Sequence, residues 1–354
     1  MEIAEAFSVS NPYRSAYQDG IRAIIAARRR EMDLIREQTA TPLDVAQNRE
    51  VWRNRLRELL GWPLNCPCEG IPELQICEEK RYGAHARFLR LQIQVLPGLP
   101  FYGILFLPDA QGPLPLIIAQ HGGGGTPELT ADLHGENNYN HMTARLLDCG
   151  CAVFAPQLLL WEENSHYPGI PSYSLPNERG KLDAQLRQAG GGIVALEVFA
   201  LIRSLDALSA LSILSRDRVG MIGLSYGGFY TQLLAALDTR IRAAATCAFF
   251  NSRYAYCWDD FAWKDAGSVM LDAEICALIA PRALCVHVGR NDHVFSVDTA
   301  LNELERLKPF FVEARAERQL KIIVSDADHR LTQNGEEIDF LLSHLQSTGV
   351  SAGN

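Results

Sequence analysis

The spacing of apolar side chains changes along the chain from helical to alternating and then to continuous, and each change predicts a different element. Residues 14–38 carry isoleucines and a methionine near helical spacing, and Leu43 to Leu60 predicts a second helix. From Leu74 to Leu107 apolar and polar residues alternate, which predicts an antiparallel hairpin. The chain is therefore expected to begin with a helical arm, residues 1–70, that leads into a sheet.

Beyond the hairpin, short apolar runs alternate with longer helical patterns. The runs are typical of strands buried on both faces, and they cover Leu114–Ala119, Cys151–Ala155, Val219–Ile222, Ile241–Cys247, Ala283–Val288 and Gln319–Val324. The helical patterns cover Asn138–Asp148, Leu182–Ser209, Tyr230–Leu237 and Glu336–Leu345. This order predicts an α/β fold with a mostly parallel, doubly wound sheet over residues 71–348, followed by a tail, 349–354.

A glycine-flanked serine stands between the strand at Val219–Ile222 and the helix after it. Gly223-Leu224-Ser225-Tyr226-Gly227 fits the pattern G-x-S-x-G, a tight turn that holds a nucleophilic serine above a parallel sheet. A side chain at either glycine would crowd the neighbouring strand or helix, and the serine backbone is expected to be strained. We therefore predict that Ser225 is a nucleophile.

A second glycine-rich turn follows the first buried strand. His121-Gly122-Gly123-Gly124-Gly125 places four consecutive glycines at the end of Leu114–Ala119, at a cost in chain entropy. A flexible loop is one interpretation. We favour an oxyanion hole, in which bare backbone N–H groups approach a ligand, because this loop precedes the serine turn in the expected chain order.

Two further polar residues lie on loops just beyond strand ends. Asp292 follows the strand Ala283–Val288, and His329 follows Gln319–Val324. Other histidines and acids compete for these roles; they are His121, His166, His287, His293, His344, Asp326 and Asp328. Position relative to the strand ends favours Asp292 and His329.

These residues together form a chemically coherent set. Because a serine hydroxyl is a poor nucleophile, His329 would accept its proton during attack, and Asp292 would orient the imidazole. The amide of Tyr226 and one or both of the amides of Gly123 and Gly124 would stabilise the oxyanion. No metal and no cofactor is needed for this chemistry.

The motifs named above, with Ala280-Pro281-Arg282-Ala283-Leu284 and Gly289-Arg290-Asn291-Asp292, resemble those of the α/β-hydrolase superfamily. Within it, residues 75–346 look most like bacterial acetyl xylan esterase-like and dienelactone hydrolase-like proteins. The chain departs from this pattern in two ways. Ser225 stands where dienelactone hydrolases have a cysteine, and Asp328 replaces the usual glycine before the histidine.

Candidates for the substrate pocket are His121, Trp161 and Trp258. Trp161 lies in the proline-rich stretch 156–181, whose aromatic residues suit an ordered wall over the site. Trp258 lies in an aromatic-dense segment, residues 249–263. That segment is equally consistent with a small satellite core and with a substrate pocket, and both interpretations stay open here.

Composition limits the kinds of binding partner and the cellular compartment that are expected for this chain. The net charge of −9 argues against binding to nucleic acid, and no apolar run approaches the ~20 residues of a membrane span. Nine scattered cysteines without a metal-binding spacing favour a reduced, cytoplasmic setting. The N-terminal arm is expected to pack on the core or on another subunit as a homo-oligomer contact, with Arg28-Arg29-Arg30 on a solvated face.

The sequence thus predicts a serine carboxylesterase that hydrolyses a small, acetyl-like ester of a carbohydrate or aryl alcohol through an acyl-enzyme. The type of acyl group and alcohol rests on the resemblance. Ser225-Tyr226-Gly227-Gly228 also resembles the serine turn of prolyl oligopeptidase-type enzymes, so a small peptidase or amidase is the alternative. A hydrolase fold used only for ligand binding is the third hypothesis.

Overall fold

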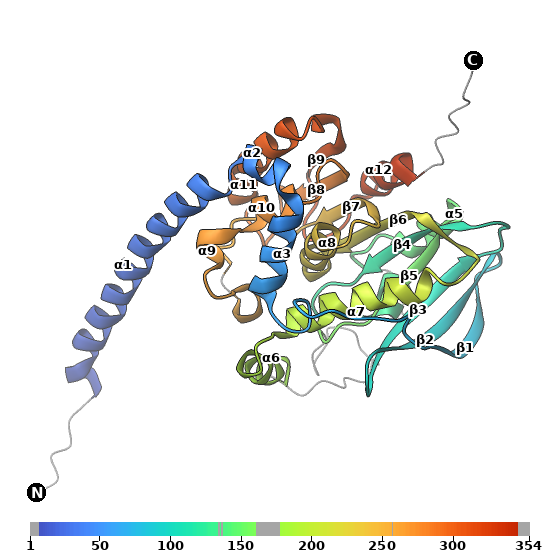
Figure 1. Cartoon of the computed structure of the whole chain (residues 1–354), viewed down its shortest axis with the longest axis horizontal. Helices are drawn as coiled ribbons and strands as arrows, with labels where there is room; N and C mark the ends of the chain where they lie inside the picture. Colours follow the sequence, from blue (N-terminus) through green and yellow to red (C-terminus); the bar gives the residue numbers. More distant parts are fainter. Residues whose placement is uncertain (1–6, 134, 136, 161–177, 257, 346–354) are drawn as a thin grey trace, which may run out of the picture.

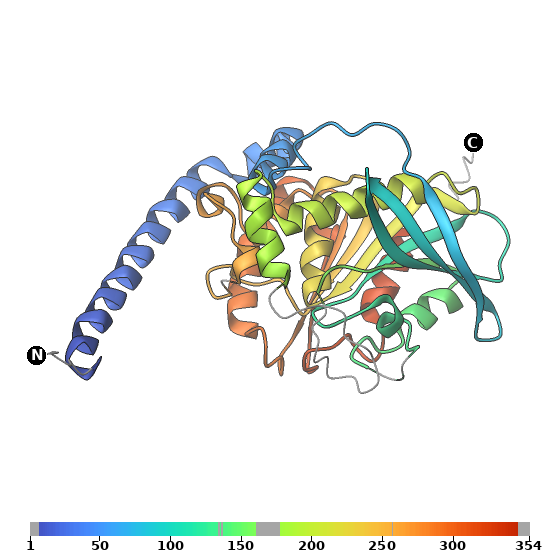
Figure 2. The same ribbon diagram turned by 90° about the horizontal axis from the view of Figure 1, so that it is seen from below.

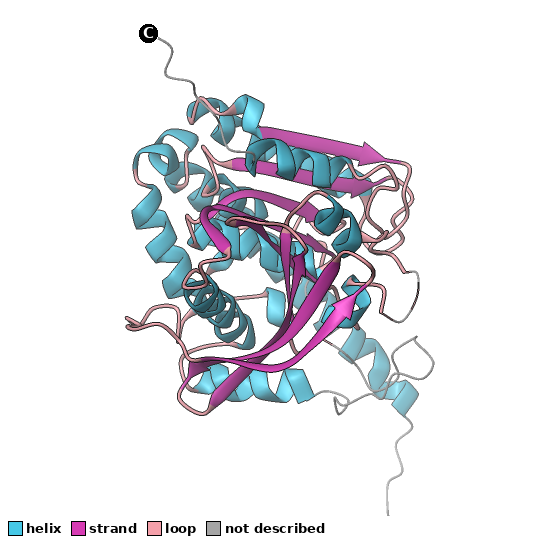
Figure 3. Cartoon of the chain, turned by 90° about the vertical axis from the view of Figure 1, so that its right-hand side faces the viewer, coloured by secondary structure: helices cyan, strands magenta, loops and turns pink. Residues whose placement is uncertain are grey.

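A nine-stranded sheet forms the centre of the molecule in the computed structural model, which describes residues 7–133, 135, 137–160, 178–256 and 258–345. The strand order is β1-β2-β3-β5-β4-β6-β7-β8-β9, so the chain crosses over once between β3 and β6. Figure 3 shows the sheet with helices on either side. The predicted α/β-hydrolase fold, with its antiparallel start and helical arm, is confirmed.

The strands fall into an antiparallel beginning and a parallel remainder. The antiparallel pairs involve β1 (Leu74–Tyr82), β2 (Ala86–Leu96) and β3 (Leu99–Pro108), and β3 also runs antiparallel to β5 (Ala152–Pro156). The parallel pairs join β5, β4 (Leu114–Gln120), β6 (Leu214–Leu224), β7 (Ile241–Cys247), β8 (Ala283–Gly289) and β9 (Leu320–Ser325). The carboxyl ends of the parallel strands therefore meet at one edge, where ligands of such sheets bind.

The helices before the serine turn are α1 (Phe7–Thr39), α2 (Pro42–Gln47), α3 (Arg49–Leu60), α4 (Pro127–Thr130), α5 (Met142–Asp148), α6 (Glu178–Gln188) and α7 (Ile193–Leu208). Those after it are α8 (Tyr226–Leu237), α9 (Ala266–Val269), α10 (Asp272–Ala277), α11 (Val297–Glu313) and α12 (Glu336–Leu345). Short 3₁₀ turns cover Asp259–Phe261 and Glu317–Gln319. None of the helices in the described residues is long and apolar enough to cross a membrane.

Each face of the sheet has its own apolar core. On one face, residues of α3, α7, α8, α10 and α11 pack against side chains such as Leu105, Met221 and Leu284. On the other face, α5 and α12 cover Ile117, Ile222 and their neighbours. Because both faces are covered, the central parts of the parallel strands are mostly apolar, which is why they were recognisable as continuous runs; the beginning of β6 is polar and more exposed.

Three predicted helices differ from the observed ones at polar or glycine positions. The helix expected over Leu43–Leu60 is interrupted at Asn48, which separates α2 from α3. The helix expected over Leu182–Ser209 is broken by Gly190-Gly191-Gly192, because consecutive glycines favour other backbone conformations. The helix expected from Asn138 begins only at Met142, since Asn140 and His141 have positive φ.

Helix α1 projects from the body of the protein, and only its carboxyl-terminal part touches it (Figures 1 and 2). Arg36 anchors this part through Glu274 at 3.2 Å and through the carbonyl of Gly267. Glu274 also pairs with Arg306 of α11 at 3.2 Å. The carboxyl-terminal end of α1 is thus held by a buried ionic cluster, whereas α2 and α3, later in the arm, pack into the apolar core.

Glu303 of α11 is a buried carboxyl group at the edge of this cluster. It accepts a hydrogen bond from the Ala273 amide at 3.1 Å, and Arg306 lies 3.7 Å away. Burial, together with the neighbouring Glu274 and Asp272, raises the pKa of Glu303 to about 7. In the unfolded chain the pKa is near the ordinary value of about 4.3. At pH values between these two pKa values, Glu303 is protonated in the folded protein but ionised in the unfolded chain. The free energy of unfolding therefore falls as pH rises through this range.

We predict that Glu303→Gln stabilises the protein at pH 8 but hardly at pH 4.5, because the amide removes an ionisation that only the folded state resists. The gain at pH 8 has an upper bound of roughly 4 kcal/mol. Urea unfolding at the two pH values measures it, with the exposed Glu305→Gln on the same helix as control. An equal effect of Glu303→Gln at both pH values would contradict the raised pKa.

Candidate active site

The turn between β6 and α8 holds Ser225 in a strained backbone conformation. Its φ is 58° and its ψ is −124°, values that non-glycine residues rarely adopt. A Cβ on Gly223 would collide with the backbone of Gly227, and a Cβ on Gly227 would collide with the carbonyl of Gln120 in β4. The crowding expected at both glycines is therefore present. The Ser225 amide donates to the Cys247 carbonyl at 2.8 Å, which ties the turn to β7.

A cavity of about 70 Å³ opens at this turn. Its walls come from the glycine loop, the segment before α5, the serine turn and the loop after β9; the lining residues are Gly122, Gly123, Gly124, Gly125, Asn138, Tyr139, Leu224, Ser225 and His329. Ser225 is only 9% exposed, so a reacting group has to enter the cavity to reach it. The structure thus brings Ser225 and His329 to one site from positions far apart in the sequence.

Asp292 and His329 form the hydrogen-bonded pair that the sequence suggested. His329 Nδ1 lies 2.9 Å from Asp292 Oδ2, while Asp292 Oδ1 accepts the amides of Val294 and Phe295 at 2.7 and 3.0 Å. Burial acts to raise the pKa of Asp292, but His329 and the two amides outweigh it and lower this pKa. Asp292 is therefore a carboxylate at neutral pH, and Nδ1 of His329 carries the proton of the pair.

The competing acids point elsewhere. The Asp326 side chain is 90% exposed and lies 3.5 Å from Arg290, and Asp328 pairs with Arg330. Neither contacts the His329 ring in the part of the chain that the structure describes. Asp292 is thus the carboxylate partner of His329.

The structure describes both Ser225 and His329, and no hydrogen bond joins these two residues. Such bonds are often long in ligand-free hydrolases and tighten when a substrate binds. With Nδ1 protonated towards Asp292, Nε2 of His329 is the atom available to accept a proton from the serine.

The amides of the glycine loop differ in what they bind. The Gly122 amide donates to the Tyr139 hydroxyl at 2.8 Å, and the Gly125 amide donates to the Gly122 carbonyl at 3.1 Å. The Gly124 amide donates to the Leu160 carbonyl, so the expectation that Gly124 supplies an oxyanion donor is wrong in this structure. The Gly123 amide has no such partner among the described residues, and a Cβ on Gly123 would lie against the ring of Tyr226.

The amide of Tyr226 is the other candidate donor. Tyr226 is the first residue of α8, where backbone N–H groups have no partner within the helix and the helix dipole favours negative charge. Its hydroxyl donates to Asp260 at 3.1 Å, and its ring stacks on Trp258. The amides of Gly123 and Tyr226 are therefore the remaining candidates for an oxyanion hole among the described residues.

His121 lies outside the cavity, which corrects its expected role as a pocket residue. It is fully buried, its Nδ1 donates to the Gly122 carbonyl at 2.8 Å, and its Nε2 accepts the Leu158 amide at 3.0 Å. Burial lowers the pKa of His121 to about 4, so the ring is neutral. Through these two hydrogen bonds, His121 links the glycine loop to the segment after β5.

The aromatic segment after β7 packs mainly into the apolar core that α7, α8 and α10 form on one face of the sheet, so neither a separate satellite core nor a substrate pocket describes it. Phe249, Phe250 and Phe261 are buried, and Arg253 lies over the neighbouring rings. Trp258 is 37% exposed and does not line the cavity, although it stacks on Tyr226 at 5.4 Å. Trp161 lies outside the described residues.

Sequence analysis missed Asn138 and Tyr139. Besides binding the Gly122 amide, this segment holds the histidine loop: Asn138 Nδ2 donates to the His329 carbonyl at 3.2 Å, and its carbonyl accepts the Leu331 amide at 3.1 Å. Their predicted place in a helix gave no sign of these contacts, because the partners are backbone atoms almost two hundred residues away. The doublet Asn137-Asn138, a frequent turn former, was the available signal.

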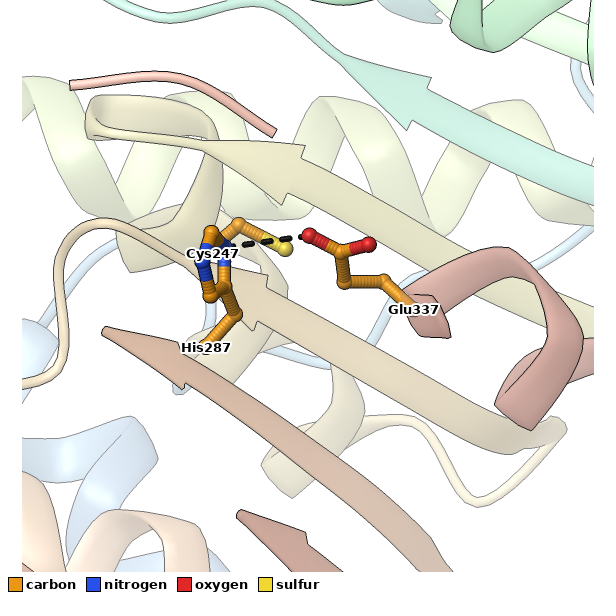
Figure 4. A group of neighbouring side chains, drawn as sticks. All are labelled: Cys247, His287 and Glu337. Carbon is orange, nitrogen blue, oxygen red and sulfur yellow. Dashed lines mark ion pairs between the residues drawn. The ribbon is translucent and has the colours of Figure 1, made fainter. Parts of the chain in front are cut away.

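Among the described residues, Cys247, His287 and Glu337 are the group whose donor atoms lie close enough to hold a metal, within 4.8 Å of one another. All three are buried, and none of them lines the cavity; Figure 4 shows how their side chains lie. The cavity itself needs no metal for the arrangement of serine, histidine and carboxylate described above.

Comparison with known proteins agrees with this fold. No curated protein sequence matches the chain significantly. The glucuronoyl esterase from Solibacter usitatus is similar in structure, with a TM-score of 0.63, 14% identity, and coverage of 85% of this chain and 93% of that one. Acetyl xylan esterase 1 from Thermoanaerobacterium sp. JW/SL YS485 gives a TM-score of 0.56 and 18% identity, covering 84% and 93%. The acetyl xylan esterase from Paenibacillus sp. R4 gives 0.56 and 15%, covering 86% and 95%.

These similarities are too distant in sequence to identify more than the fold. The sequence model of the Dienelactone hydrolase family, in contrast, matches residues 101–340, more than half of the chain and every element of the candidate site. The prediction of a hydrolase that acts on ester bonds is confirmed at the level of the family. This chain belongs to the Dienelactone hydrolase family, within the α/β-hydrolase superfamily.

Proposed function

We propose that this protein is a serine carboxylesterase that cleaves a small acyl ester through an acyl-enzyme. The observation that carries the proposal is the 2.9 Å hydrogen bond between His329 and Asp292, formed at the wall of the cavity that contains Ser225. A serine held on a strained turn, a histidine with a fixed tautomer and bare amides beside them are the parts that acyl transfer requires.

The reaction would begin with attack of Ser225 Oγ on the carbonyl carbon of the ester. His329 Nε2 takes the hydroxyl proton as the new C–O bond forms, and Asp292 stabilises the imidazolium. The amides of Gly123 and Tyr226 would stabilise the negative charge that develops on the carbonyl oxygen. The dipole of α8 adds to this stabilisation because its amino-terminal end faces the same place.

Collapse of the tetrahedral intermediate would release the alcohol, which receives its proton from His329. Water then attacks the acyl-enzyme, with His329 again accepting the proton and Ser225 leaving as the protonated hydroxyl. Both half-reactions use Ser225, His329 and Asp292, and His329 first accepts a proton and then donates it in each of them. These residues would therefore suffice for a complete turnover.

A short acyl group and a carbohydrate or aryl alcohol are the proposed substrate features. The cavity of about 70 Å³ supports a small acyl group, since sites for drug-sized ligands measure roughly 300–1,000 Å³. The similar structures named above are esterases of glucuronoyl and acetyl xylan type, which is consistent with a carbohydrate alcohol. A cytoplasmic location remains a proposal, supported by the free cysteines of the described chain.

We predict that the protein hydrolyses p-nitrophenyl acetate faster than the butyrate and octanoate esters, and that Ser225→Ala abolishes this activity. The cavity limits the chain length of the acyl group, and the mutant lacks the nucleophile. Steady-state rates for the three esters, beside a panel of aminoacyl-p-nitroanilides, test both points. Tm values of the two proteins control for folding.

Other outcomes would favour the alternatives. Cleavage of the anilides with the same dependence on Ser225 would favour a peptidase or amidase. Equal activity of wild type and Ser225→Ala would show that Ser225 is not the nucleophile, and a protein that neither cleaves the panel nor reacts with a fluorophosphonate would favour a binding role.

Tyr139→Phe is expected to lower kcat on the order of 10-fold, less than the 10²–10³ lost with an oxyanion donor itself. The mutant leaves the Gly122 amide without the hydroxyl that it binds and loosens the loop that carries Gly123. Tyr82→Phe, which also loses a hydroxyl bound to the backbone, at Ala131, is the matched control. If both mutants lose stability and neither loses kcat, Tyr139 has only a structural role.

We also propose that the projecting part of α1 binds a second copy of the chain. Tyr13, Tyr17, Ile21 and Ile24 recur on one side of this helix and are 77%, 75%, 40% and 70% exposed. An isolated helix with an apolar stripe is marginal in water, so pairing with the same stripe of another copy would stabilise it.

The double mutant Tyr17→Glu/Ile24→Glu is expected to convert a dimer into a monomer, because it places charges in the proposed contact. Light scattering after gel filtration measures the mass. Arg22→Glu, on the opposite side of the helix, should leave the dimer intact. A wild-type protein that is monomeric at micromolar concentration would contradict the proposal.

A further inference from the structure

A buried group of polar side chains lies beneath the candidate site, on the face of the sheet covered by α12 (Figure 4). His287 of β8 is fully buried, and the side chain of Glu337, in the first turn of α12, is 1% exposed. His287 Nδ1 lies 3.0 Å from Glu337 Oε1. The two side chains are therefore in direct polar contact in the core.

Polar atoms of His287 and Glu337 also contact the two ends of one loop. His287 Nε2 lies 2.7 Å from Ser325 Oγ, at the end of β9. Glu337 Oε1 accepts the Thr332 amide at 2.9 Å, and Oε2 accepts the Thr332 hydroxyl. Ser325 and Thr332 bracket the residues between them, and His329 is one of those residues.

The same loop is joined to the segment that carries the acid. The Arg290 amide donates to the Ser325 carbonyl at 2.8 Å, and the Asn291 amide donates to the Ala327 carbonyl at 3.1 Å. A shift of Ser325 would therefore move the backbone next to Asp292 as well as the backbone next to His329. The position of Ser325 therefore affects how the side chains of Asp292 and His329 lie relative to each other.

The charge of Glu337 suits this arrangement. Burial acts to raise the pKa of Glu337, but His287 and the two groups of Thr332 outweigh it and lower this pKa. Glu337 is thus a buried carboxylate at neutral pH. Well-packed apolar residues often stabilise a core as much as or more than a buried ion pair does, so overall stability alone does not account for this pair.

A metal site is the rival interpretation, since Cys247 lies near both side chains. Structural zinc sites have four protein ligands, and among the described residues this group offers three. Both carboxylate oxygens of Glu337 also accept hydrogen bonds from Thr332. These features favour a hydrogen-bonded support over a metal centre.

We propose that Glu337 and His287 are positioning residues that fix both ends of the His329 loop and so hold His329 in register with Asp292. The inference rests on the proposed role of His329 as the proton acceptor of Ser225. It assigns to the last helix of the domain a part in catalysis without any contact with substrate.

The test compares Glu337→Gln and His287→Phe with Glu336→Gln, the adjacent carboxylate, which bonds to Asn334 instead. A displacement of about 1 Å costs on the order of 100-fold in rate, so we expect kcat for p-nitrophenyl acetate to fall about 10- to 100-fold. KM should stay within about twofold, because neither Glu337 nor His287 lines the cavity. Glu336→Gln should match wild type.

A double-mutant cycle separates positioning from general stability. Ser325→Ala breaks the link between His287 and β9, and it should lower kcat by itself. If both changes act through one linkage, Glu337→Gln/Ser325→Ala loses less than the product of the single losses. A lowered Tm with unchanged kcat in the single mutants would overturn the proposal, as would one equivalent of zinc that is bound by wild type and lost in Glu337→Gln.

A readout without catalysis distinguishes failure of this inference from failure of the proposed esterase. The low-field proton resonance of His329 Nδ1, assigned by its loss in His329→Gln, reports the bond to Asp292. It should weaken or shift in Glu337→Gln and stay in Glu336→Gln, even if no ester in the panel is a substrate. An unchanged resonance in Glu337→Gln would refute the positioning role in either case.

Discussion

The conformation of Ser225 is the constraint on which the site depends. A residue at φ 58° and ψ −124° is costly to hold and persists only where the surroundings leave no alternative. Here they come from three neighbouring strands: β4 presses its Gln120 carbonyl against Gly227, β6 delivers the chain to the turn, and β7 accepts the Ser225 amide. The serine is therefore positioned by the packed sheet and not by its own loop.

The strand order then determines which groups meet at that serine. Because β4 is the neighbour of β6, the glycine loop after β4 lies beside the serine turn, although about one hundred residues separate them. Because β8 and β9 are neighbours, the loops with Asp292 and His329 share backbone hydrogen bonds. The strand order thus brings the loops after β4, β6 and β9 into one cavity, and the loop after β8 adds Asp292, which binds His329.

Much of this could be predicted from the sequence because it depends on local patterns. Continuous apolar runs marked the buried strands, and loop position after a strand end singled out Asp292 and His329. The errors have physical reasons as well. Asn48 and Gly190-Gly191-Gly192 interrupt helices that apolar spacing alone extends, and His121 follows a strand end like the other site residues but turns into the core.

The contacts around the glycine loop and His329 that no motif indicated have one property in common: they end on backbone atoms. Tyr139 binds an amide of the glycine loop, Asn138 binds the His329 carbonyl, and Leu160 takes the amide of Gly124. Every residue has a backbone amide or carbonyl, so such partners leave no trace in residue type or spacing. Motifs can therefore name the groups that would react, whereas the geometry that would make them reactive depends on long-range backbone contacts that only the folded chain reveals.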